Sequence, residues 1–184
     1  MEALLVMDMQ TPIMAMVGNP APLLQNVRKA IDGARAKGVP VIFVTVTFRP
    51  GFPEISPNNM AFHAVRQRAA LFADPAGTAV HPDLEPQASD VIVLKRRVSA
   101  FAGSDLEIVL RSQGIRHLVL TGIATSGVVL STLREAADRD YRLTVLSDCC
   151  ADTDGEVHNL LLGKIFPRQA DVVTAGQWIG SRTD

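Results

Sequence analysis

The stretch LVLTGIATSGVVLSTLREAADRDY, residues 118–141, decides the fold, because three kinds of local structure follow one another in it. The apolar run 118–120 predicts a buried strand that ends at Gly122. Thr125 and Ser126 then mark a helix start, and apolar residues recur behind them at the spacing of one helix face. A junction of this kind directs free backbone N–H groups toward whatever lies above the sheet.

The same alternation of strand and helix runs through the rest of the chain. Apolar runs predict strands near residues 2–8, 40–46, 90–95, 117–122, 142–147 and 171–174. Alternating strands and helices are typical of a parallel sheet that is covered by helices on both faces. We therefore predict one α/β domain over residues 1–184, doubly wound, with three α/β/α layers and a six-stranded, mainly parallel sheet.

Helix ends are marked at several places. The first long helix is expected to have Asn19 as its N-cap and Pro20 as its first residue, and to end before Gly38. The pattern S/T-x-x-E predicts two later helix starts with capping boxes. These pairs are Ser104 with Glu107 and Thr153 with Glu156.

The turn after Gly122 resembles the signature of the isochorismatase-like hydrolases, a cysteine hydrolase superfamily that includes nicotinamidases, carbamoylsarcosine amidases and isochorismatases. Their motif is G-x-x-T-x-x-C-V. This chain matches it at Gly122, Thr125 and Val129, with Val128 in the place of the cysteine. Three more matches follow the family's order, namely Asp8 with Gln10 in LLVMDMQ, Lys95 in VIVLKRRVSAFAGSDL and Asp148 in VLSDCCAD. The resemblance covers nearly the whole chain and implies a Rossmann-like fold.

Composition is consistent with an enzyme that handles small molecules. The 184 residues carry a net charge of −1 with mixed signs, which gives no footprint for nucleic acid or an anionic membrane. No apolar run approaches the roughly 20 residues that span a bilayer, and no basic segment precedes the first apolar run. The two adjacent cysteines, Cys149 and Cys150, cannot join distant segments, so we expect a reducing, cytoplasmic location.

Asp8 and Lys95 end two predicted strands, so both are expected at the carboxyl edge of the sheet, where doubly wound folds bind ligands. Strand-end charges are often plain structural ion pairs or loop caps. The resemblance favours a catalytic pair, in which the aspartate handles protons and the lysine orients or stabilises charge beside it. Burial raises the pKa of such a carboxyl group and a neighbouring lysine lowers it, so the sequence leaves the protonation state of Asp8 open.

The resemblance also implies a non-proline cis peptide bond at Ile123–Ala124 and an oxyanion hole made by the backbone N–H groups of Ala124 and Val128. Ordinary strand-to-helix packing is the alternative for this turn. Valine has no lone pair, so the thioester route of the amidases is closed at Val128. Cys149 and Cys150 are expected to be inert packing residues rather than substitutes. Asp148 is expected to cap or position its loop.

No metal is predicted. Nicotinamidase-like relatives carry D-x-H-x-x-H after the second strand, whereas TVTFRPGFPEISPNNMAFHAV holds only His63. His81, His117 and His158 are scattered and are interpreted as surface or capping residues. The segment 48–63 reads as a loop over the sheet edge that is either solvated or lines a substrate pocket. The substrate-binding candidates are Gln10, Phe48, Arg49, Phe52, Phe62 and Thr125, with Arg49 placed to hold an anionic group.

Two functions follow from the resemblance. In the first, Asp8 protonates an enol-ether-like substrate and water completes the cleavage, so that no cysteine is needed. The W-G-P-G-like segment of true isochorismatases is absent from RQRAALFADPAGTAVHP at residues 66–82, which leaves the substrate open. In the second, the chain binds a small acid or amide without catalysis, or serves as a scaffold. Neither function requires a cofactor, and relatives form homo-oligomers, so at least a homodimer is expected.

Overall fold

The computed structural model describes residues 1–67 and 75–181. In these ranges six strands form one sheet in the order β3-β2-β1-β4-β5-β6, and every neighbouring pair is parallel. The strands are β1 (Glu2–Met7), β2 (Val41–Val46), β3 (Val91–Lys95), β4 (His117–Ile123), β5 (Arg142–Ala151) and β6 (Asp171–Val173). The predicted doubly wound α/β sheet is confirmed. The predicted strand length is clearly wrong only for β5, which runs four residues beyond the predicted end at 147.

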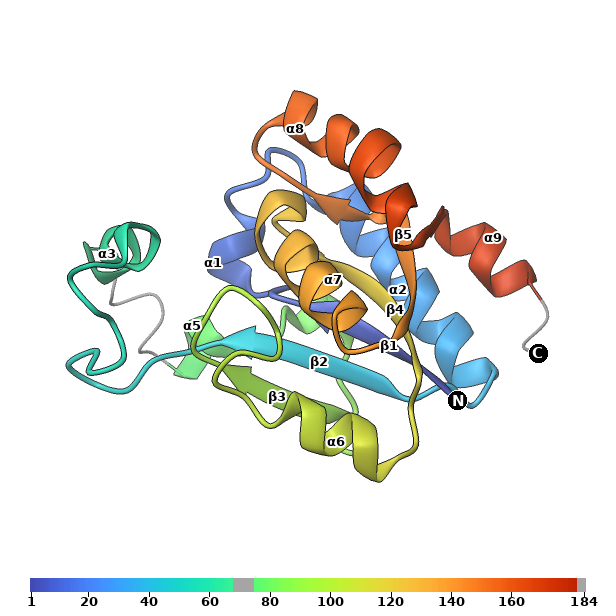
Figure 1. Cartoon of the computed structure of the whole chain (residues 1–184), viewed down its shortest axis with the longest axis horizontal. Helices are drawn as coiled ribbons and strands as arrows, with labels where there is room; N and C mark the ends of the chain where they lie inside the picture. Colours follow the sequence, from blue (N-terminus) through green and yellow to red (C-terminus); the bar gives the residue numbers. More distant parts are fainter. Residues whose placement is uncertain (68–74, 182–184) are drawn as a thin grey trace.

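Helices cover both faces of this sheet (Figure 1). On one face α2 (Ala21–Ala36) and α9 (Ala175–Gly180) pack against Leu4 and Val6 of β1. On the other face α6 (Leu106–Ser112) and α7 (Leu130–Ala137) pack against Leu5 and Met7. Successive residues of β1 therefore enter opposite cores, as the two-residue period of a strand requires. These cores fix β1 at the centre of the molecule.

The chain changes direction beside β1. It moves outward through β2 to β3, returns to the other side of β1 as β4, and continues outward through β5 to β6. The loops that leave the carboxyl ends of β1 and β4 consequently separate at this point and open a crevice. The predicted position of a ligand site at this edge follows directly from the strand order.

The helix caps differ from the predictions by short shifts along the sequence. The carbonyl oxygen Oδ1 of Asn19 accepts the N–H of Ala21 at 3.2 Å, and α2 ends just before Gly38, so the first helix agrees within one residue. The predicted capping boxes do not form. Ser104 caps Leu106 directly, while Asp154 rather than Thr153 accepts two N–H groups at the start of α8 (Gly155–Leu160). The capping box that does form joins Thr174 and Gln177 in α9.

Short helical segments complete the structure. They are α1 (Thr11–Met14), α3 (Met60–Gln67), α5 (Pro75–Thr78), η1 (Pro82–Leu84), η2 (Thr125–Val129), η3 (Leu161–Ile165) and η4 (Phe166–Arg168). Figure 1 shows α3 beyond the carboxyl end of β2, apart from the helices that cover the sheet. Within the described ranges, none of the helices is both long and apolar enough to cross a membrane.

Candidate active site

Asp8 and Lys95 form an ion pair at the carboxyl edge of the sheet. Asp8 follows β1 in a left-handed backbone conformation (φ 56°), which aspartate tolerates better than most residues, and its N–H donates to Val44 on β2. Lys95 ends β3, and its Nζ lies 2.8 Å from Oδ2 of Asp8. The two strand ends thus meet at one edge of the sheet, and the two charged groups are within ion-pair distance. Both residues are buried, with 6% and 1% of their surfaces exposed.

The two ends of this pair are satisfied unequally. The Lys95 ammonium also donates to the carbonyl oxygens of Arg97 and Val98, each at 2.9 Å, so all three of its N–H groups have acceptors. The hydrogen bonding of the carboxylate is less complete, because Oδ1 of Asp8 is buried and has no hydrogen-bond partner. Burial raises the pKa of Asp8, while Lys95 acts in the opposite direction and only partly offsets it. The Asp8 carboxyl group therefore keeps its proton to a higher pH than an ordinary aspartate does.

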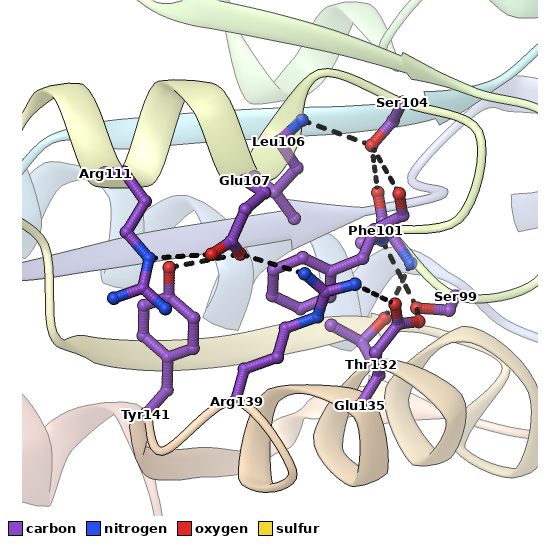
Figure 2. A network of polar contacts seen from close by, with 11 residues as sticks. Ser99, Phe101, Ser104, Leu106, Glu107, Arg111, Thr132, Glu135, Arg139 and Tyr141 are labelled. Atoms are coloured by element: carbon purple, nitrogen blue, oxygen red, sulfur yellow. Dashed lines mark hydrogen bonds and ion pairs between the residues drawn. The ribbon is translucent and has the colours of Figure 1, made fainter.

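The loop that holds Lys95 is itself held by α7. Figure 2 shows Ser99, Thr132 and Glu135 at this contact, where Ser99 donates to Glu135 at 2.5 Å. The Ala100 N–H donates to Oγ1 of Thr132 at 3.0 Å. Glu135 is in turn paired with Arg139 at 2.6 Å. Because residues 97 and 98 supply the two carbonyl acceptors of Lys95, these contacts with α7 fix the ammonium group next to Asp8.

The strand-to-helix turn brings Val128 to the same edge. The cis peptide bond implied by the resemblance is present at Ile123–Ala124. A Cβ atom at Gly122 would lie 2.7 Å from the Met7 carbonyl oxygen and 3.3 Å from Cγ1 of Val128, so only glycine allows β4, β1 and this valine to approach so closely. Val128 is 2% exposed and packs in the core below the turn. Its side chain serves packing, and the oxyanion role of the Ala124 and Val128 N–H groups stays a prediction.

Two residues that sequence reasoning did not connect with the turn hold it in place. Oγ1 of the buried Thr125 lies 2.8 Å from Nδ1 of His158 on α8, and the Ser126 N–H donates to Oδ2 of Asp152 at 2.7 Å. Burial lowers the pKa of His158, which favours the neutral ring. The sequence predicts no role for Asp152 and a surface or capping position for His158, because the predicted strand ends at 147 whereas β5 continues to Ala151, directly before Asp152.

A pocket of about 280 Å3 opens beside this turn. Phe48 and Phe62 lie in its wall with Ile123 and Ala124, as do Ser126 and Asp152 at the polar side. The Phe48 and Phe62 rings meet edge to face at 5.5 Å. Asp8, Lys95 and Val128 are not among the lining residues, and all three are buried.

The remaining binding candidates have other neighbours. Gln10 is fully buried and exchanges hydrogen bonds with the backbone of Val46 at 2.8 and 3.0 Å, which joins β1 to β2. Arg49 is largely exposed and pairs with Glu54 at 2.6 Å, outside the pocket wall. Phe52 contacts the ring of Phe48 from outside that wall. Of the predicted loop residues, Phe48 and Phe62 are thus the two that face the pocket.

The cysteines are poor nucleophiles. Both are buried, and burial raises the pKa of the Cys149 thiol strongly and that of the Cys150 thiol to about 12. Asp148 accepts the Ala175 N–H at 2.7 Å and thereby anchors the start of α9. Over residues 1–67 and 75–181, no group of three His, Cys, Asp or Glu side chains is arranged to hold a metal ion.

Comparisons with known proteins agree with this geometry. The family model described as "Isochorismatase domain" matches residues 2–177. A ureidoacrylate amidohydrolase (RutB) of Pseudomonas savastanoi pv. phaseolicola is 34% identical over 99% of this chain and 81% of its own length. The uncharacterized isochorismatase family protein YecD of Escherichia coli O157:H7 is 34% identical over 92% of this chain and 90% of its own length.

Solved structures give the same result. An isochorismatase family protein from Burkholderia thailandensis has a TM-score of 0.81 at 32% identity and covers 95% of this chain and 92% of its own. A cysteine hydrolase from Pseudomonas syringae pv. phaseolicola has a TM-score of 0.88 at 27% identity, over 97% of this chain and 90% of its own. Because the family model matches nearly the whole of this chain, the chain belongs to the isochorismatase family of hydrolases.

Proposed function

We propose that this chain hydrolyses a small molecule by acid–base chemistry at Asp8, without a covalent intermediate. The observation that carries the proposal is the buried Asp8 carboxyl group, which has Lys95 on Oδ2 and no partner on Oδ1. A structural ion pair is expected to satisfy both oxygens, because an unpaired buried acceptor costs about 1–3 kcal/mol. An unpaired oxygen beside a fixed cation is instead suited to give and take a proton.

The proposed reaction needs only Asp8, Lys95 and water. Protonated Asp8 donates its proton to the leaving atom of the substrate while water attacks the carbon to which that atom is bound. The water then loses a proton to the Asp8 carboxylate, which restores the acid, and Lys95 stabilises the carboxylate in between. The backbone N–H groups of Ala124 and Val128 would stabilise negative charge that develops on the substrate. Substrate binding must bring an atom within hydrogen-bond reach of Oδ1.

Val128 separates this mechanism from that of an amidase with a cysteine nucleophile. An apolar side chain at this position cannot form a thioester, and Cys149 and Cys150 have pKa values that disfavour the thiolate. The relatives named ureidoacrylate amidohydrolases nevertheless place ureas and amides among the compounds to be tried. Enol ethers are the second class, because their cleavage needs a proton donor but no nucleophile from the protein.

Hydrolysis of a panel of neutral amides, ureas, enol ethers and ureidoacrylate tests the proposal, with products followed by mass spectrometry. We expect Asp8→Asn to lower the rate for any substrate by about 10²–10⁴-fold. Val128→Ala should keep the rate within about tenfold, since the side chain has no chemical role. Asp83→Asn, a change at an exposed carboxylate, is the control and should match the wild type.

Full activity in the Asp8→Asn variant would refute the proposal. If compounds of the panel bind but none is turned over by the wild type, the non-catalytic binding function takes its place.

A further inference from the structure

The pocket has an unusual charge distribution for its size. Eight of its eleven lining residues are apolar, and the other three are Ser126, Asp152 and Thr153. Asp152 is thus the one charged side chain among the described residues that line it. A ligand in this pocket meets apolar walls and a single carboxylate.

Asp152 is held firmly and stays ionised. Its Oδ2 accepts the Ser126 N–H at 2.7 Å, and its Oδ1 accepts the Asp154 N–H at 3.3 Å. These hydrogen bonds lower the pKa of Asp152 against the opposing effect of partial burial. A carboxylate offers about four acceptor sites, so Asp152 keeps capacity for a hydrogen bond from a ligand.

The described cationic side chains around the pocket are not part of its lining. Arg49 and Arg96 both pair with Glu54, at 2.6 and 3.4 Å, and Lys95 is buried against Asp8. Arg97 lies over the ring of Phe62, 5.9 Å from its centroid, and is not part of the lining. The neutral ring of His158 adds no charge. A ligand carboxylate would therefore face Asp152 without a compensating cation in the described wall.

We propose that this pocket selects small molecules with an apolar body and an N–H-donating head group, an amide or an amine, and that Asp152 sets this preference and excludes carboxylates. The proposal goes beyond the function proposed above and does not depend on it, because Asp8 and Lys95 are not among the residues that line this pocket. A volume of about 280 Å3 corresponds to roughly nine water molecules at about 30 Å3 each, which suits a molecule of about ten non-hydrogen atoms. Specificity here arises from an interaction that is unfavourable for the wrong ligand.

Three probes with one phenyl body and different head groups test this inference: benzamide, benzylamine and benzoate. Their binding to the full chain is measured by ligand-detected NMR at neutral pH. We expect benzamide and benzylamine to bind at least about tenfold more tightly than benzoate. Repulsion between two carboxylates in a partly buried site lowers the affinity for benzoate by more than that factor. Equal binding of benzoate would overturn the inference. So would the absence of binding by all three probes at concentrations up to about 10 mM, which is weak even for a small fragment.

The variants Asp152→Asn and Asp152→Ser assign the effect to one residue. Both replacements keep an oxygen that can accept the Ser126 N–H, so the turn should be retained. We expect either change to weaken benzylamine at least tenfold and to bring benzoate level with benzamide. Glu156→Gln, which removes an exposed charge on α8 outside the lining, is the matched control and should leave the order of the probes unchanged. An unchanged order in the Asp152 variants would contradict the inference.

Failure of this inference can be told apart from failure of the proposed hydrolysis. Binding is measured without turnover, and Asp8→Asn should retain the wild-type order of the three probes. A chain that shows the predicted order but hydrolyses nothing would retain the Asp152 subsite and lose the proposed function. A chain that hydrolyses carboxylates at rates that depend on Asp8 would support the proposed function and contradict the Asp152 subsite.

Discussion

At the scale of single residues, two opposing effects act on the pKa of Asp8. Its carboxyl group is buried beside a lysine, yet burial outweighs the lysine and the pKa is raised. The position of this pair was predictable from the sequence, since both residues end apolar strands and such ends meet at one edge. The unpaired Oδ1 was not predictable, because it depends on which side chains fail to reach that atom.

Asp8 makes the stability of the fold depend on pH. Its folded pKa lies above the unfolded value, so the folded chain keeps a proton at pH values where the unfolded chain has lost it. The resulting stabilisation is complete below the unfolded pKa and is lost as the pH rises through the folded pKa. We expect the difference in free energy of unfolding between wild type and Asp8→Asn to fall from about pH 4 upward. Urea unfolding at a series of pH values measures it, and a flat or rising difference would contradict the prediction.

Val128→Cys tests whether the turn keeps the geometry of a nucleophile site. The new thiol would lie at a helix start, where the thiolate is favoured, unlike the thiols of Cys149 and Cys150. We expect iodoacetamide to label position 128 at least tenfold faster than the native cysteines, as counted by peptide mass spectrometry. Adding Asp8→Asn should slow this labelling if Asp8 takes up the proton. An unreactive thiol at position 128 would identify the turn as ordinary packing.

At the scale of elements, the loop after β3 depends on α7 for its position. The Ala100 N–H is buried and donates to Thr132, and the same loop supplies the carbonyl groups that hold Lys95. The sequence predicted α7 and β3 but not this contact, because 36 residues separate Ser99 from its acceptor Glu135. Long-range hydrogen bonds of this kind leave no periodic pattern in the chain.

Thr132→Val removes the acceptor and keeps the volume of the side chain nearly constant. The Ala100 N–H would then be buried without a partner, and we expect the free energy of unfolding to fall by about 1–3 kcal/mol. Ser112→Ala, which removes an exposed hydroxyl group from α6, is the control and should change stability by less than about 0.5 kcal/mol. Denaturant unfolding of the two variants measures both values. Equal effects would show that the loop is not held by Thr132.

At the scale of the whole molecule, the six-stranded parallel sheet and its two helical layers were predictable, whereas the shape of the pocket was not. Alternating apolar strands and helices leave few arrangements for a chain of this length. The irregular pairing between Leu120 and Gly122 allows β5 to continue to Ala151, and an irregularity of this kind has no sequence signature here. Asp152 follows this extended strand and lines the pocket, whereas Arg49, the residue predicted to hold an anionic group, does not line it.

Association of two chains remains a prediction at this scale. Several large apolar side chains are at least half exposed, including Met16, Met60, Ile92 and Ile108. We expect a homodimer or a larger closed assembly. Light scattering at micromolar concentrations gives the mass, and a monomer mass across that range would refute the prediction.

The proposal that Asp8 is the acid is tested most directly by titrating its own carboxyl group, followed through the ¹³Cγ NMR signal that Asp8→Asn removes. We predict a midpoint clearly above the ordinary aspartate value of about 3.9, because burial outweighs the attraction of Lys95. A midpoint at or below about 3.9 would mean that Lys95 dominates. Asp8 and Lys95 would then be a structural ion pair, and hydrolysis by an Asp8 acid would be excluded.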